Sequence, residues 1–223
     1  MGIKTKVQMS ISVLLENGGR SVWLSLPANK ARFTATLEKI GGEYGDFIIK
    51  EYACRVPSLC MKMLMEKPLS LVNYLASRLN KLKSDDILKL CAICESDHYF
   101  YIIEQYIDFT FQTDSYTLLR GVTDEEALGA YHIGDPKRRI ADKTVKQYIA
   151  RREYGRRLAE AENGVFTSHG YLTSAIGWDL PPIIERHIPE SLNLKGYINE
   201  DLYGTWNDFI IPYYDYEGGK NEA

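Results

Sequence analysis

Signals that start and stop helices are densest between Leu118 and Tyr171, and they restrict this stretch to short helices separated by turns. Thr123 and Glu126 have the spacing of a capping box, in which the Thr123 hydroxyl accepts from the Glu126 amide and the Glu126 carboxylate reaches back. Acidic residues at this point also suit the positive end of a helix dipole. Because Pro136 disfavours helical geometry at Asp135, we expect this first helix to end there.

A second helix is expected to begin near Asp142 or Thr144 and to end at Asn163-Gly164, which is typical of a left-handed cap. Gly155 lies on the apolar face of this helix, where a glycine costs about 1 kcal/mol relative to alanine. A glycine at such a position is more often explained by the close approach of another backbone than by a binding site. We therefore expect a tightly packed contact at Gly155.

Four arginines give the second helix a basic patch that allows two interpretations. In the first, the patch binds the phosphates of a nucleic acid. In the second, it is a solvated helix face whose charges pair with Glu153, Glu160 and Glu162. The four residues are Arg151, Arg152, Arg156 and Arg157.

The order of hydrophobic patterns predicts an α+β protein, built as an elongated chain of three small units. Alternating apolar residues predict a hairpin within residues 3–24, followed by a helix from Pro27 to Ile40 and a strand over 46–52. This order gives an N-terminal βαβ-like unit, expected to span residues 1–66. The Met-rich stretch 55–67 at its end is expected to be irregular.

The second expected unit is helical and spans residues 67–135. Pro68 suits the first turn of a helix, Ser84 suits the cap of the next one, and residues 99–109 are strongly apolar. The third expected unit, residues 136–223, is α+β and ends in an acidic tail rich in tyrosine.

The formal net charge of −3 is unevenly distributed along the chain. Residues 1–90 carry 14 basic and 8 acidic groups, whereas residues 91–223 carry 13 basic and 22 acidic groups. This asymmetry favours a charged partner or self-association. No apolar run approaches the roughly 20 residues that cross a bilayer, and the first residues lack the cleavage site of a signal peptide. We therefore expect a cytoplasmic protein that does not act at a membrane.

Patterns typical of catalysis are missing, because the chain has no glycine-rich phosphate loop, no HExxH and no GxSxG. Cys91 and Cys94 form a CxxC, but their helical pattern favours buried structural thiols over a metal or redox site. Ser168 and His169 could be a nucleophile and its base, although a triad is recognised by geometry and not by adjacency. We predict no enzyme activity, no bound metal and no cofactor.

Several blocks in a consistent order resemble the ArdA family, the antirestriction proteins of mobile genetic elements such as conjugative transposons. The clearest blocks are GVTDEEALGAY at residues 121–131 and EYGRRLAEAENGVFTSHGY at residues 153–171. Earlier blocks begin at Trp23 and at Pro68. Together the blocks cover about residues 21–175, and the C-terminal residues match poorly.

The resemblance implies a bacterial homodimer that imitates bent duplex DNA and inhibits the methyltransferase complex of a type I restriction–modification enzyme without catalysis. The physical basis is that duplex DNA carries about one charge per 1.7 Å, so an array of carboxylates can bind the same basic groups. The carboxylates carried over by block are Asp97, Glu104, Asp108, Asp114, Asp124, Glu125, Glu126 and Asp135. Leu128, Gly129 and Tyr131 are carried over as packing or dimer-contact residues.

The nearly balanced charge of this chain departs from the family pattern, because ArdA proteins are strongly acidic. A mimic surface would therefore be confined to the middle and C-terminal parts of the chain. The alternative hypothesis keeps the fold without the mimicry: an accessory module that binds nucleic acid or another protein through its arginine-rich helix. Duplex binding through Arg151, Arg152, Arg156 and Arg157 would weaken steeply as salt rises.

Overall fold

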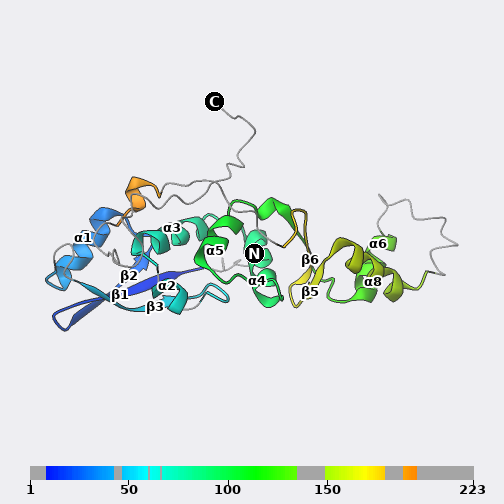
Figure 1. The fold of residues 1–223 in the computed structure, drawn as a ribbon, viewed down its shortest axis with the longest axis horizontal. Coiled ribbons are helices and arrows are strands. Elements are labelled where there is room, and N and C mark those ends of the chain that lie inside the picture. The colour runs from blue at the N-terminus through cyan, green and yellow to red at the C-terminus, as the bar shows by residue number, and fades with distance from the viewer. Residues whose placement is uncertain are drawn as a thin grey trace, which may run out of the picture. The chain divides into compact units, whose positions relative to one another are not determined.

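The computed structural model describes residues 9–42, 47–59, 61–65, 67–134, 149–178 and 188–194. The chain divides into two compact units. Unit 1 consists of Met1–Ser84, Phe100–Phe111 and Pro181–Ala223, and unit 2 consists of Asp85–Tyr99 and Gln112–Leu180. Each unit combines helices with a small antiparallel sheet, which confirms the predicted α+β class (Figure 1). The predicted boundaries after residues 66 and 135 stay a prediction.

The sheet of unit 1 has the strand order β2-β1-β3. Gly18 and Gly19 turn the chain between the first two strands with φ of 54° and 82°, a conformation that glycine adopts at little cost. Because β2 and β3 both run antiparallel to β1, they are parallel to each other, and the predicted βαβ-like order becomes a split one. The strands are β1 (Ile11–Asn17), β2 (Arg20–Leu26) and β3 (Ile48–Cys54).

Helix α1 (Lys30–Lys39) connects β2 to β3 and starts three residues later than the sequence predicted. The Asn29 side chain accepts from the Arg32 amide at 2.9 Å and caps the helix, so Pro27 stays outside it. Phe33 and Leu37 are the apolar residues of α1 that enter the core.

Helix α3 (Leu69–Leu79) is the most deeply buried helix of unit 1 and contacts β2 and α5 (Ile103–Phe109). Pro68 caps α3, close to its predicted place in the first turn. The expectation of an irregular Met-rich stretch was wrong in part, because α2 (Met61–Met65) packs on β3 and buries Leu64 completely. Burial of Leu64 supplies the order that the local pattern did not show. The last described element of unit 1 is the short 3-10 helix η2 (Glu190–Leu192).

Unit 2 has a second antiparallel sheet, with the strand order β4-β6-β5. Helix α4 begins at Ser84, the residue predicted to cap it, and β5 and β6 form a hairpin. Strand β4 was not predicted and lies inside the stretch expected to be helical; its ladder with β6 decides its conformation. The elements are α4 (Ser84–Glu95), η1 (Thr113–Ser115), β4 (Tyr116–Leu119), α6 (Glu125–Gly134), α8 (Arg151–Glu162), β5 (Val165–Thr167) and β6 (Gly170–Ser174).

The core of unit 2 joins this sheet to α6 and α8, which lie side by side in Figure 1. Leu128 of α6 and Tyr171 of β6 are its largest fully buried members, and Leu158 of α8 and Phe166 of β5 pack against them. The described residues contain no helix long and apolar enough to cross a membrane.

The helix ends in unit 2 follow the sequence signals with two corrections, both at helix starts. The cap of α6 is Asp124 and not Thr123, because the Asp124 carboxylate accepts from the Ala127 amide at 2.7 Å. Helix α8 ends at Asn163 with φ 48° and ψ 40°, which confirms the left-handed cap. The predicted start of this helix near Asp142 or Thr144 was wrong, because α8 begins at Arg151 and the preceding Ala150 is its N-cap with an extended backbone (φ −66°, ψ 100°). Asp142 and Thr144 themselves lie outside the described residues.

Candidate functional site

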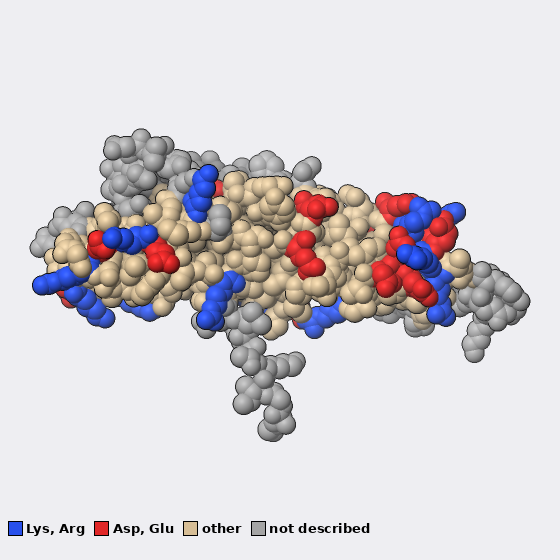
Figure 2. Space-filling model, turned by 90° about the horizontal axis from the view of Figure 1, so that it is seen from below, with Lys and Arg blue, Asp and Glu red and all other residues tan. Residues whose placement is uncertain are grey.

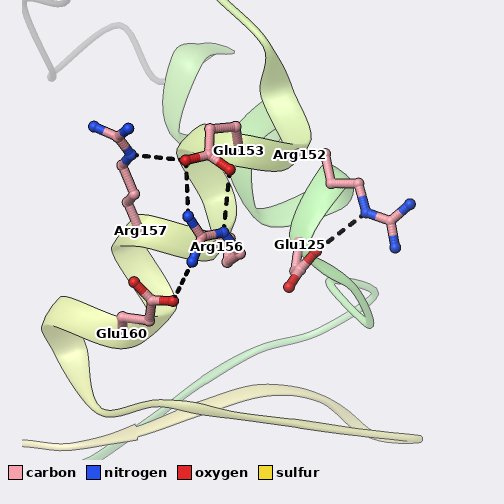
Figure 3. Close-up of polar contacts among 6 residues, drawn as sticks. All are labelled: Glu125, Arg152, Glu153, Arg156, Arg157 and Glu160. Carbon is pink, nitrogen blue, oxygen red and sulfur yellow. Dashed lines mark hydrogen bonds and ion pairs between the residues drawn. The ribbon is translucent and has the colours of Figure 1, made fainter.

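Two of the four arginines of α8, Arg156 and Arg157, are held by acidic residues of the same helix (Figure 3). Arg156 binds Glu153 at 2.8 Å and Glu160 at 2.5 Å, and Arg157 binds Glu153 at 2.9 Å. These partners are three or four residues apart, the spacing that brings side chains together on a helix surface. Hydrogen bonds from the two guanidinium groups lower the pKa of Glu153 to about 2, so its carboxylate stays charged at any physiological pH.

The remaining two arginines of the patch, Arg151 and Arg152, are also exposed. Arg152 reaches from α8 to Glu125 of α6, with 3.1 Å between Nε and Oε2, and its side chain is 81 % exposed. Arg151 is exposed and has no ion pair among the residues that the structure describes. Glu162 accepts a hydrogen bond from the Tyr171 hydroxyl at 3.1 Å. The solvated, ion-paired interpretation of α8 is therefore confirmed for Arg156 and Arg157.

The surface over α6 and α8 consequently carries both signs of charge. Figure 2 shows acidic and basic side chains intermingled there, with neither sign forming a separate field. Opposite charges in contact cancel each other at the distances over which a partner is attracted. The basic patch in the sequence is therefore weaker than its four arginines suggest.

Two glycines set the contact between α6 and α8. A Cβ atom on Gly155 would lie 1.8 Å from the carbonyl oxygen of Glu125, and one on Gly129 would lie 1.9 Å from that of Arg151. Both helices therefore approach each other backbone to backbone, which confirms the close contact expected at Gly155. Of the three residues carried over for packing or dimer contact, Leu128 and Gly129 are buried in unit 2, whereas Tyr131 is 48 % exposed.

The predicted DNA-mimic carboxylates fall into two groups, and the first is held within the chain. Glu104 and Asp108 are half-buried on α5 in unit 1, where Glu104 binds Lys67 at 2.5 Å. Glu125 is half-buried on α6 and bound to Arg152. A carboxylate already paired with a cation offers less charge to a partner.

The second group is exposed and lies in unit 2. Asp97 follows α4, Asp114 lies in η1, and Asp124 and Glu126 lie at the start of α6. None of these four residues has an ion pair among the described residues. Asp135, the last of the predicted mimic residues, lies outside the residues that the structure describes.

The start of α6 also borders an open cavity of about 420 Å³. Arg152 is the positively charged residue among the described residues that line the cavity, and it forms an ion pair with Glu125. The cavity therefore combines three carboxylates with one aromatic ring. Its lining consists of Thr123, Asp124, Glu125, Glu126, Arg152 and Phe166.

The Ser168–His169 pair does not have the geometry of a nucleophile and its base. The Ser168 hydroxyl and amide both donate to Glu95, each at 2.7 Å, and His169 Nε2 lies 3.7 Å from the same carboxylate. The amide hydrogen bond and the hydroxyl hydrogen bond from Ser168 lower the pKa of Glu95. Serine and histidine thus face one carboxylate, which ties the β5–β6 turn to α4. Sequence reasoning missed Glu95, since it lies 73 residues away from Ser168.

The CxxC thiols, which lie among the described residues, show no sign of a reactive site. Cys91 and Cys94 are half-buried and not disulfide-bonded, and burial raises the pKa of the Cys91 thiol. A thiol with a raised pKa carries less of the nucleophilic thiolate at neutral pH. Among the described residues no group of His, Cys, Asp and Glu side chains is placed to hold a metal ion.

Comparison with known proteins identifies the chain by family. The comparison with curated proteins found no match. The family model described as "Antirestriction protein (ArdA)" matches residues 17–173, which is more than half of the chain and includes every element from β2 to β5. The matched range contains the exposed carboxylates of unit 2 and the whole of the α6–α8 contact. The chain therefore belongs to the ArdA family of antirestriction proteins.

Proposed function

We propose that this protein inhibits type I restriction–modification enzymes by placing carboxylates where the phosphates of DNA would bind. The observation that carries the proposal is the exposed group Asp97, Asp114, Asp124 and Glu126, which has no ion pair among the described residues and lies within the ArdA match. A groove that binds DNA carries lysines and arginines, and free carboxylates can form the same charge-assisted hydrogen bonds with them.

The cavity at the start of α6 supports the same proposal. A lysine or arginine of the enzyme could place its charged end near Asp124 and Glu126 and its apolar stem against Phe166. Opposite potentials on the two proteins would raise the association rate, and this gain falls as salt screens the charges. The inhibitor would act by occupancy, so inhibition would follow stoichiometry and not turnover.

We also propose a homodimer, as the family resemblance implies. Of the residues considered for the dimer contact, Tyr131 is the exposed one, while Leu128 and Gly129 are committed to packing inside unit 2. An exposed tyrosine suits an interface because it offers a large apolar ring with a hydroxyl that can still bind water.

The alternative function, nucleic-acid binding through α8, has one favourable observation. Arg151 and Arg152 are exposed, and Arg151 has no ion pair among the described residues. The ion pairs of Arg156 and Arg157 oppose it, because a phosphate would have to compete with Glu153 and Glu160. A gel-shift titration with duplex DNA at low salt tests this alternative, and a flat titration would eliminate it.

The main experiment measures DNA cleavage by a purified type I enzyme with increasing amounts of this protein. The wild-type chain is expected to stop cleavage at stoichiometric excess. The variant Asp97→Asn/Asp114→Asn/Glu126→Gln removes three free charges and keeps the side-chain shapes, and we expect at least about a tenfold weaker inhibition, equivalent to about 1.4 kcal/mol. Asp124 is left unchanged because it caps α6.

The matched control removes carboxylates that are already paired together with the arginines that pair them, in the variant Glu153→Gln/Arg156→Gln/Arg157→Gln/Glu160→Gln, which leaves the net charge unchanged. It is expected to inhibit as well as the wild type. Unhindered cleavage in the presence of excess wild-type protein would reject the proposed inhibition. Equal loss in both variants would instead keep inhibition but reject the assignment to the free carboxylates.

A further inference from the structure

We propose that residues 188–194 form a clasp that completes unit 1, although they come from beyond the family-matched range, which ends at residue 173. The clasp contains η2 and lies against α3, the most buried helix of the unit. The consequence is that residues 188–194 control how often unit 1 opens locally and exposes its backbone amides to exchange.

Asn73 is a polar residue on α3 that is fully buried. Its side-chain oxygen accepts from the Ala28 amide at 2.8 Å, and its side-chain nitrogen donates to the Ala28 carbonyl at 2.8 Å and to the Leu192 carbonyl at 2.9 Å. An asparagine side chain has two N–H donors, so the Leu192 carbonyl satisfies the second of them. A buried polar group of this kind is expensive to leave without a partner.

Ser70, one turn before Asn73, makes a second pair of contacts with the clasp. Its hydroxyl donates to the Asn193 side-chain oxygen at 3.1 Å and accepts from the Leu194 amide at 2.9 Å. The Leu194 side chain is 1 % exposed and belongs to the core. Lys30 at the start of α1 forms an ion pair with Glu190 at the rim. The clasp is therefore held by backbone, side-chain, apolar and ionic contacts at once.

Asn73 also connects the clasp to the rest of unit 1, so loss of the clasp contacts would affect residues beyond α3. Both backbone groups of Ala28 bind this one side chain, so the connection between β2 and α1 is anchored to α3 through Asn73. Without the Leu192 carbonyl, the side chain keeps its native position only with one donor unpaired. Rotation or hydration of Asn73 would then loosen its hold on Ala28.

Hydrogen exchange of backbone amides in the full chain tests the clasp. Leu194→Ala shortens the buried side chain, and Ser70→Ala removes two hydrogen bonds with little change of volume. Both are expected to speed exchange of the Ala28 amide at least about tenfold, because local opening becomes more frequent. Exchange in β6 of unit 2 serves as the internal reference and is expected to stay unchanged.

Ser191→Ala is the matched control, since Ser191 lies in η2 with an exposed side chain. Its Ala28 exchange rate is expected to equal that of the wild type. If Leu194→Ala or Ser70→Ala leaves the Ala28 rate unchanged, the clasp does not control the unit and the proposal is rejected. Should Leu194→Ala fail to fold, the milder Ser70→Ala variant decides the question.

A second measurement asks whether the clasp binds its own chain. The variant Ser70→Cys/Asn193→Cys is oxidised in a mixture of isotopically heavy and light chains, and the peptides joined by the new disulfide are identified by mass spectrometry. Pairs of equal isotope content are expected. Pairs that combine heavy and light peptides would show that the clasp is exchanged between copies, which would overturn its assignment to one chain. Neither measurement involves a restriction enzyme, so both are independent of the proposed function.

Discussion

Two parts of unit 2 carry carboxylates that differ in whether an arginine of the chain binds them. On α8, Glu153 and Glu160 bind arginines of their own helix. Asp97 and Asp114, which lie after α4 and in η1, have no ion pair among the described residues. Helix geometry brings residues three and four positions apart into contact, whereas neither Asp97 nor Asp114 has a lysine or arginine three or four positions away. The position of a charge thus decides whether a partner can use it.

This comparison also changes the meaning of the net charge. A chain with a formal charge of −3 can still offer free carboxylates to a partner, provided that its arginines are occupied elsewhere. The α6–α8 pair occupies Arg152, Arg156 and Arg157 in this way. The near balance of charge, which departs from the family pattern, therefore does not by itself exclude a mimic surface.

The largest expected effect comes from disrupting the backbone contact between α6 and α8, the helix pair that carries the paired charges. Gly155→Ala would place a Cβ atom 1.8 Å from the Glu125 carbonyl oxygen, so α8 must move away from α6. We expect a loss of at least about 3 kcal/mol in the free energy of unfolding, at the upper end of overpacking costs. Chemical denaturation followed by circular dichroism measures it.

The control for this variant is Gly134→Ala, at the last residue of α6, where an added Cβ would meet nothing within 4 Å. It is expected to leave stability unchanged or to raise it by up to about 1 kcal/mol, because alanine is the better helix former. A Gly155→Ala variant as stable as this control would show that the two helices are not in backbone contact.

A smaller effect is expected at Asp124, which belongs to the free carboxylates and also caps α6. Asp124→Ala should lower the free energy of unfolding by about 1 kcal/mol, the usual cost of losing a cap, while Asp124→Asn should retain most of it. Thermal unfolding of both variants measures the difference. Thr123→Ala is expected to change little, and a larger loss there than at Asp124 would restore the cap predicted from the sequence.

The smallest expected effect is the pH dependence of stability that comes from the lowered pKa of Glu153. The pKa of Glu153 is lowered to about 2, below the ordinary glutamate value of about 4.3. A lowered folded-state pKa adds stability that is present above about pH 4 and is lost as the pH falls toward 2. In Arg156→Gln/Arg157→Gln the pKa should return toward its ordinary value, as measured by a carboxyl NMR titration. An unshifted titration of Glu153 in the wild type would mean that these ion pairs do not form in solution.

Several features of the site could be predicted from local sequence because their physics is local. The left-handed cap at Asn163 and the charge pairs at Glu153 depend on residues within one turn of helix. The close contact at Gly155 could also be predicted, since an interior glycine is unfavourable without a packing reason. Its partner could not, because nothing in the sequence specifies that the Glu125 carbonyl lies opposite.

Local patterns along the chain were enough to predict the α+β class, the main helices, the family resemblance and which side chains can carry charge. Folding in three dimensions was needed to fix which charges stay free, that residues 116–119 form a strand, and that Leu192 completes the hydrogen bonds of Asn73. The physical reason is distance along the chain. Caps and helix pairs are set by neighbours three or four residues away, whereas the Asn73–Leu192 contact joins residues 119 positions apart.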